Sequence, residues 1–199
     1  MGTISISPNN KYILGTFEIA SEVCAWDLKT GILVTTLKVG KDLGSLDISP
    51  DGKEIALSYY KKLQIWNLKT SKVLLSVDNQ EEFGFQMAYS HDGKKLAVGL
   101  GSGDINIYDP KTLKVVAILK GHFKPVLSVS FNKTDNYLLS GSSDQMAKVW
   151  NIKTNKILKS LVNIHRGTVS AVRFNPVSNT FATTGDDGTV QMWKLVTPL

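Results

Sequence analysis

The side chains best suited to chemistry are two histidine–aspartate pairs. His122 is followed 22 residues later by Asp144, and His165 is followed 22 residues later by Asp187. An aspartate that orients a histidine base could activate a serine, but such catalysis also needs an accessible nucleophile and an oxyanion hole. A tryptophan lies 28 residues after each histidine. A constellation that occurs twice at one interval indicates a repeated structural unit, so we predict no catalytic residue.

No other set of residues has the spacing of a metal or cofactor site. Cys24 is the only cysteine, which excludes a disulfide framework and argues against cysteine-based zinc binding. The glycine-rich segment 99–104 has the composition of a phosphate-binding loop. However, it lies between two predicted strands, and no helix follows to present amide groups to a phosphate. We therefore predict a protein that is not an enzyme and has no cofactor or metal.

The composition is that of a folded protein with a slightly basic surface. The 199 residues are 42% hydrophobic and 20% charged, with 23 lysines and arginines against 17 aspartates and glutamates. These fractions exclude intrinsic disorder, and no apolar run approaches the roughly 18 residues of a membrane helix. The N-terminus lacks the basic and apolar segments of a secretory signal. We expect no membrane contact and a cytoplasmic or nuclear location.

An internal repeat of 40–43 residues runs through the whole chain. Its clearest mark is an aromatic residue that ends a short alternating phrase, and successive aromatics are 40, 42, 42 and 43 residues apart. Turn phrases rich in Ser, Pro, Asp, Asn and Gly keep the same period, and these residue types favour tight turns. The five aromatics are Trp26, Trp66, Tyr108, Trp150 and Trp193.

Each repeat contains short apolar or alternating runs, which predict strands. In the fourth repeat the predicted strands, named a to d in chain order, are residues 126–131, 137–141, 146–150 and 156–162. No segment has the 3.6-residue apolar period of a helix. A four-stranded antiparallel meander cannot bury both of its faces alone. We therefore predict an all-β fold in which such sheets pack radially.

The repeats resemble those of WD-repeat β-propellers. That motif has Gly-His before strand a, Asp in the b–c turn and Trp-Asp at the end of strand c, and the fourth and fifth repeats match it best. The resemblance implies one buried hydrogen-bonded tetrad in each of these repeats, made of His, Asp, Trp and a strand-b hydroxyl. Repeats one to three lack the histidine, so no tetrad is expected in them. The implied members are His122, Ser140, Asp144 and Trp150 in repeat four, and His165, Asp187, Trp193 and either Thr183 or Thr184 in repeat five.

The resemblance also implies one propeller domain with five blades, at residues 1–38, 39–78, 79–120, 121–163 and 164–199. Repeat five ends after strand c, which makes 19 strands. The usual ring of this family has seven blades, and its last blade borrows an outer strand from the N-terminus. Only Met1-Gly2 precedes the first predicted strand. We therefore expect part of a seven-bladed ring with two uncovered apolar faces, and a tightly closed five-bladed ring is the alternative.

Within the family, the last three repeats are most similar to the small seven-bladed subunit shared by two complexes. These are the superkiller (Ski) complex and the RNA polymerase II-associated factor complex, so the similarity implies a role in RNA decay or transcription elongation. Scaffolds of signalling, ciliary or ribosome-assembly complexes are the alternatives. The supporting stretches are residues 87–94, 104–109, 121–125 and 184–187.

A propeller of this kind is expected to be a non-catalytic scaffold that binds other protein subunits. The d–a and b–c loops form its top face, and loops on a rigid frame commonly carry function. Aromatic and arginine side chains dominate binding energies at interfaces. The candidate partner-binding residues on these loops are Tyr59, Tyr60, Phe83, Phe85, Phe123 and Arg166.

Binding of nucleic acid or another anionic surface is the second hypothesis. The a–b and c–d turns place lysines on the bottom face, where they could contact phosphates. Scattered lysines without interleaved aromatics are also typical of solvated turns. The lysines concerned are Lys11, Lys29, Lys53, Lys69, Lys94, Lys95, Lys111, Lys133 and Lys153.

Overall fold

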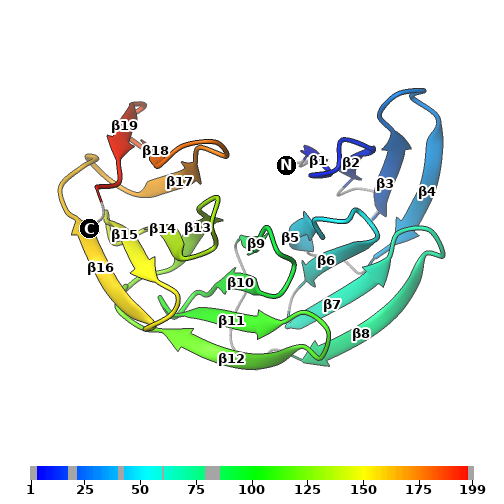
Figure 1. The fold of residues 1–199 in the computed structure, drawn as a ribbon, viewed down its shortest axis with the longest axis horizontal. Helices are drawn as coiled ribbons and strands as arrows, with labels where there is room; N and C mark the ends of the chain where they lie inside the picture. Colours follow the sequence, from blue (N-terminus) through cyan, green and yellow to red (C-terminus); the bar gives the residue numbers. More distant parts are fainter. Residues whose placement is uncertain (1–3, 18–21, 40–42, 60, 79–85, 197–199) are drawn as a thin grey trace.

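The computed structural model describes residues 4–17, 22–39, 43–59, 61–78 and 86–196. Within these ranges the chain forms 19 strands in five antiparallel sheets, which follow one another around an arc (Figure 1). The all-β class and the number of strands are as predicted. None of the described residues belongs to a helix that could cross a membrane.

Four of the sheets have four strands in chain order, and the fifth has three. The first sheet contains β1 (Ile4–Ile6), β2 (Tyr12–Phe17), β3 (Glu22–Asp27) and β4 (Leu33–Lys38). The second contains β5 (Leu43–Ile48), β6 (Glu54–Tyr59), β7 (Lys62–Asn67) and β8 (Lys72–Asp78). The third contains β9 (Met87–Tyr89), β10 (Leu96–Gly99), β11 (Ile105–Asp109) and β12 (Lys114–Leu119). The fourth contains β13 (Val126–Phe131), β14 (Tyr137–Ser142), β15 (Ala147–Asn151) and β16 (Lys156–Leu161). The fifth contains β17 (Val169–Phe174), β18 (Thr180–Gly185) and β19 (Val190–Lys194).

One apolar cluster fills the space between each pair of neighbouring sheets. In β6, Ile55 and Leu57 belong to the cluster shared with the first sheet, while Ala56 between them belongs to the cluster shared with the third. Side chains alternate between the two faces of a strand. Burial on both faces therefore explains why central strands such as β6 are continuous apolar runs.

Hydrogen bonds also join the innermost strands of neighbouring sheets. The N–H of Tyr89 donates to Asp47 Oδ2 at 2.7 Å, and the N–H of Phe174 donates to Ser130 Oγ at 3.1 Å. An innermost strand has one edge without a ladder partner, so side-chain acceptors satisfy its exposed donors. These bonds fix the spacing of the sheets around the inside of the arc.

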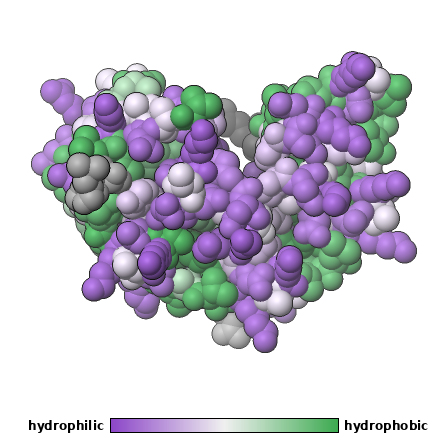
Figure 2. All heavy atoms as spheres, viewed as in Figure 1, coloured by the Kyte–Doolittle hydropathy of each residue, from purple (hydrophilic) through white to green (hydrophobic). Residues whose placement is uncertain are grey.

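In the part of the chain that the structure describes, the first and fifth sheets each leave one face uncovered. The described residues form four clusters between five sheets, whereas a closed ring of five sheets needs a fifth cluster. Ile4 and Ile6 on the first sheet are 74% and 53% exposed, and Val190 and Met192 on the fifth are 66% and 69% exposed. Figure 2 shows a notch in the surface between these two ends. The described residues therefore form an open arc with apolar end faces, not the closed five-bladed ring that was the alternative.

Candidate functional site

The fourth sheet holds a network of four buried polar side chains. His122, in the loop before β13, contacts Asp144 Oδ2 through Nδ1 (2.7 Å) and Ser140 Oγ through Nε2 (2.8 Å). The indole Nε1 of Trp150 donates to the same Ser140 oxygen at 2.8 Å. All four residues are buried. The residues named from the resemblance are thus brought together in one hydrogen-bonded site.

The hydrogen-bond pattern of this network fits a neutral imidazole. Nδ1 of His122 donates to Asp144, so Nε2 accepts from the Ser140 hydroxyl, whose oxygen accepts from Trp150. Burial lowers the pKa of His122, and the Asp144 carboxylate opposes this shift only in part. Each of the four side chains therefore has a partner, as a buried polar network requires.

The fifth sheet repeats the network closer to solvent. His165 Nδ1 lies 3.1 Å from Asp187 Oδ1, and its Nε2 lies 2.9 Å from Thr183 Oγ1. Trp193 Nε1 donates to Thr183 Oγ1 at 3.1 Å. Thr183 therefore provides the hydroxyl of this network, and Thr184 does not take part in these bonds. Unlike its equivalent in the fourth sheet, the tryptophan is only half-buried.

Neither network has the geometry of a nucleophilic centre. Ser140 and Thr183 are fully buried, and each hydroxyl already bridges a histidine and a tryptophan. A substrate cannot reach these oxygens, so the networks hold a loop and a turn in place. Among the described residues there is also no group of three or more His, Cys, Asp or Glu side chains that could hold a metal ion.

The glycine-rich segment 99–104 has a packing role. Gly103 has a φ of +94°, and a Cβ at this position would lie 2.6 Å from the carbonyl oxygen of His122. Only glycine combines this backbone conformation with so close an approach. The turn between β10 and β11 therefore packs directly on the loop that carries the histidine.

The second and third sheets provide their aromatic residues with other partners. Trp66 Nε1 donates to Gln64 Oε1 at 2.9 Å, and Gln64 Nε2 donates to Ser76 Oγ at 3.0 Å. Asn106 Nδ2 donates to the hydroxyl oxygen of Tyr108 at 3.3 Å. Sequence reasoning missed these residues. The signal was a polar residue two positions before the aromatic, which places both on the same face of one strand.

Two loops of the top face present exposed side chains beside the networks. Phe123 and Arg166 each directly follow the histidine of a network. The N–H of Phe123 donates to Asp144 Oδ2 at 3.3 Å, and its side chain is 66% exposed. Arg166 is also exposed, and its backbone N–H donates to Asp187 Oδ2 at 2.8 Å. This N–H and the Thr189 hydroxyl hold the pKa of Asp187 well below its usual range, so a charged carboxylate anchors the loop.

Of the other aromatic candidates, the structure describes Tyr59. Tyr59 is the last residue of β6, where it is half-buried against the cluster between the first two sheets. The prediction that it lies in the b–c turn is therefore wrong, because its ring completes the core instead. Tyr60, Phe83 and Phe85 lie outside the described residues.

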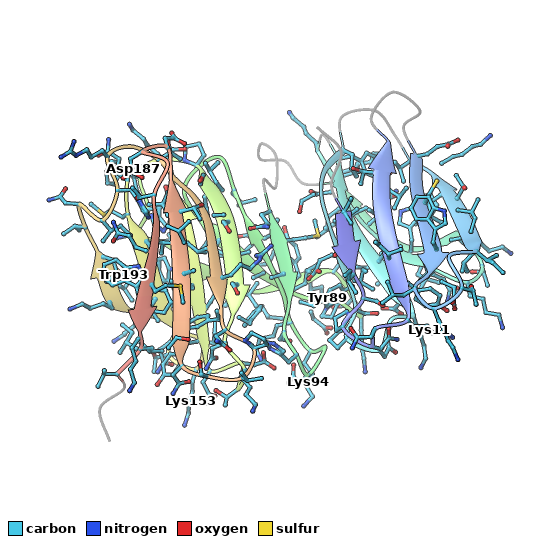
Figure 3. All side chains as sticks on the ribbon, turned by 90° about the horizontal axis from the view of Figure 1, so that it is seen from above. Lys11, Tyr89, Lys94, Lys153, Asp187 and Trp193 are labelled. Carbon is cyan, nitrogen blue, oxygen red and sulfur yellow. The ribbon has the colours of Figure 1, made fainter. Side chains whose placement is uncertain are left out.

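The lysines of the a–b and c–d turns project from the opposite end of the sheets. Figure 3 shows Lys11, Lys94 and Lys153 at one end and Asp187 at the other. Eight of the nine predicted lysines are exposed, and Lys95 is half-buried. The molecule therefore has a lysine-bearing end opposite the end with the two networks.

We expect Ser140→Ala to destabilise the protein because it removes the hydroxyl that both His122 and Trp150 contact. Each buried polar group left without a partner costs about 1–3 kcal/mol. The free energy of unfolding, measured by urea denaturation, should fall by roughly 2–4 kcal/mol. Thr183→Ala should cost less, and Ser178→Ala in an exposed turn should change stability by less than about 0.5 kcal/mol. Equal effects at Ser140 and Ser178 would contradict the proposed role of the network.

We expect the His122 network to make stability depend on pH. Folding lowers the pKa of His122 from 6.5, so below this pH the unfolded chain binds more protons than the folded chain. The stability linked to His122 is therefore lost as the pH falls. Burial raises the pKa of Asp47 to about 6, so its contribution to the unfolding free energy changes with pH in the opposite direction. Comparing wild type with His122→Asn isolates the contribution of His122. Between about pH 7 and pH 5, the unfolding free energy of wild type should decrease more than that of the variant, and parallel curves would refute this.

The model of the family described as "WD domain, G-beta repeat" matches residues 113–151 and 155–194. Each match begins beside the outer strand of one sheet and ends at strand c of the next. The two matched segments contain both hydrogen-bonded networks, so the residues of the repeat and the geometry of the sheets point to the same architecture.

Several relatives resemble much of the chain. WD repeat-containing protein SL1-17 of Schistosoma mansoni is 31% identical over 98% of this chain and 79% of its own length. Polyadenylation factor subunit 2 of Candida albicans is 26% identical over 66% of this chain and 24% of its own length. Anaphase-promoting complex subunit cdc20 of Dictyostelium discoideum is 27% identical over 71% of this chain and 28% of its own length. With its repeated sheets, its tetrads and these relatives, the chain belongs to the WD-repeat family of β-propellers.

Proposed function

We propose that this chain is a non-catalytic scaffold that binds other proteins through the loops of its top face. The observation that carries this proposal is the position of Phe123 and Arg166. Both side chains are exposed, while their backbone N–H groups donate to the aspartates of buried networks. Side chains presented from a rigid backbone lose less entropy on binding, and aromatic and arginine residues are typical interface anchors.

Two relatives support a role in multiprotein complexes. Polyadenylation factor subunit 2 and anaphase-promoting complex subunit cdc20 are both named as subunits. This chain spans only about a quarter of the length of either protein, so their partners are not assigned to it. They favour a scaffold over an enzyme, as do the inaccessible hydroxyls of the two networks.

The specific complex follows from the sequence resemblance alone. We propose a subunit of a complex in RNA decay or transcription elongation, in the cytoplasm, the nucleus or both. We also propose that the arc is part of a seven-bladed ring. In support, the aligned region of SL1-17 spans 239 residues, whereas this chain has 199. That relative therefore has about one repeat more in the aligned region.

We expect Phe123→Ala combined with Arg166→Ala to weaken partner binding without lowering stability. Removing an interface anchor commonly costs about 1–2 kcal/mol, so two anchors should reduce capture about tenfold or more. The measurement is quantitative mass spectrometry of proteins captured from a lysate by the tagged chain. The matched control combines Val177→Ala with Lys153→Ala, which are exposed and lie in turns at the opposite end. If both variants capture the same proteins as wild type, the top-face loops are not the binding site.

The lysine-bearing end supports a second candidate function, binding of a polyanion such as RNA. Exposed lysines lie on the a–b and c–d turns of each of the first four sheets. Lys11, Lys94 and Lys153, from three of these sheets, lie at the same end of the molecule (Figure 3). Phosphate contacts release counterions, so binding of this kind weakens steeply with salt. This function is compatible with scaffolding on the other face.

We expect Lys69→Gln, Lys111→Gln and Lys153→Gln together to weaken binding of a single-stranded RNA about tenfold or more at low salt. Fluorescence anisotropy at 50 and 200 mM salt is the measurement, and affinity of the wild type should fall steeply between the two. Lys159→Gln, on an outer strand, is the control. Absence of RNA binding by the wild type at 50 mM salt would exclude this function.

A further inference from the structure

The outer strand of the third sheet carries an exposed apolar patch. Val115, Val116 and Ile118 of β12 are 43%, 58% and 47% exposed, and these three residues are named the β12 patch. The strand lies on the outside of the arc, next to β8 of the second sheet (Figure 1). The other outer strands also expose two aliphatic residues, opposite the aromatic of strand c and at the next position. These pairs are Leu33-Val34, Val73-Leu74 and Ile157-Leu158.

Ile118 distinguishes β12 from the other three outer strands. At the equivalent position those strands carry a hydroxyl, which contacts the polar or sulfur atom of the strand-c residue opposite. In the third sheet Ile118 lies opposite Asn106, whose Nδ2 donates to the hydroxyl oxygen of Tyr108 at 3.3 Å instead. Neighbouring exposed apolar side chains mark interaction sites. The three hydroxyl contacts are Thr36 Oγ1 with Cys24 Sγ (3.5 Å), Ser76 Oγ with Gln64 Nε2 (3.0 Å) and Ser160 Oγ with Lys148 Nζ (3.1 Å).

The β12 patch lies beside the junction between the second and third sheets. Ile118 is opposite Asn106, which is two residues before Tyr108, and side chains two residues apart share one face of a strand. Tyr108 belongs to the apolar cluster between the second and third sheets. Leu75 and Val77 of β8 are half-buried and pack against the same cluster. Aliphatic side chains of both outer strands therefore reach the circumference at this junction.

The backbone of β12 favours an extended ligand. Among the described residues no strand pairs with its outer edge, so N–H and C=O groups along that edge can form a ladder with an added strand. Strand addition gives affinity through this ladder and specificity through alternate side chains. A helix or a lipid surface could cover the apolar side chains but would not continue the ladder.

The charges around β12 favour an acidic ligand. Lys114 begins the strand and Lys120 directly follows it, both are exposed, and residues 110–120 include no acidic residue. Lys120 Nζ lies 3.6 Å from Asp104 Oδ2, and an exposed ion pair of this kind contributes little. In an antiparallel pair of two β12 strands centred on Ala117, Lys114 of each copy would lie opposite Lys120 of the other. Like charges opposite each other are unfavourable, so the edge suits a different, acidic chain better than a second copy.

We propose that β12 binds an extended acidic and aliphatic segment of a partner protein as a fifth strand of the third sheet. In the antiparallel register, acidic residues lie opposite Lys120 and Lys114, and aliphatic residues lie opposite Ile118 and Val116. The segment therefore has the pattern Asp/Glu-x-aliphatic-x-aliphatic-x-Asp/Glu. This surface is separate from the top-face loops, so the top-face double variant should bind the segment as wild type does, and either proposal can fail without the other.

The test uses a synthetic peptide in which Glu, Thr, Val, Thr, Val, Thr and Glu follow one another between short Gly-Ser flanks. Calorimetry with the 199-residue chain should give a dissociation constant below about 1 mM. Replacing both peptide valines by aspartate should weaken binding at least about tenfold. Replacing both peptide glutamates by lysine should weaken it about fivefold. Hydrogen exchange should show new protection of amides in residues 114–119.

Two matched pairs of variants locate the site on the protein. Ile118→Ser, which introduces the hydroxyl of the other sheets, should weaken peptide binding about fivefold or more. Val34→Ser, at an exposed position of the first sheet, should not change it. Lys114→Gln should weaken binding about twofold or more, whereas Lys156→Gln at the equivalent position of β16 should not. Circular dichroism verifies that each variant is folded.

Three results would overturn the proposal. The first is that the folded wild type does not bind the peptide at millimolar concentration, or that Ile118→Ser and Val34→Ser behave alike. The second is a dimer in sedimentation that Ile118→Ser dissociates and excess peptide does not, because a second copy then covers the β12 patch. The third is binding to vesicles of phosphatidylcholine and phosphatidylserine that Ile118→Ser abolishes and the peptide does not compete with, because the patch is then a lipid-binding surface.

Discussion

Every sheet of this protein carries side chains that need burial on both faces, and a four-stranded meander can bury them only between two neighbours. That constraint produces the radial arrangement, with one apolar cluster in each of four interfaces. It also determines what the surface offers. Loops collect at the two ends of the strands and outer strands line the circumference, and among the described residues the first and last sheets keep one apolar face each.

The aromatic residues packed into these interfaces carry polar N–H or O–H groups that need hydrogen-bond partners, and the sheets provide different partners. The indole N–H of Trp150 is fully buried and must find an acceptor, because an unpaired buried donor is costly. In the fourth and fifth sheets the acceptor is a hydroxyl that a histidine from the preceding loop also contacts. In the second sheet the acceptor is Gln64 on the same strand. Among the described residues, the first solution is the one that ties a top-face loop to the core, and it presents Phe123 and Arg166 from a fixed backbone.

The repeat in the sequence is out of phase with the sheet in the structure. The family match at residues 113–151 takes in β12, which belongs to the third sheet, and ends with β15 of the fourth. One sequence repeat therefore contributes the outer strand of one sheet and the first three strands of the next sheet. The same phase difference goes with three strands in the fifth sheet among the described residues.

The sequence by itself determined the all-β class and the 19 strands, because strand period, turn chemistry and aromatic spacing are local properties repeated five times. The resemblance to WD-repeat proteins supplied the network residues, apart from the choice between Thr183 and Thr184. In the fourth repeat the predicted strands differ from the observed ones by at most one residue at either end. Only the tertiary structure decided between Thr183 and Thr184, since the two face opposite sides of β18 and a slip of one residue exchanges the faces. It also decided the burial of Tyr59 and the substitute role of Gln64. The burial of Tyr59 depends on the packing of the second sheet against the first. The role of Gln64 depends on the pairing of β7 with β8, which places Ser76 opposite it.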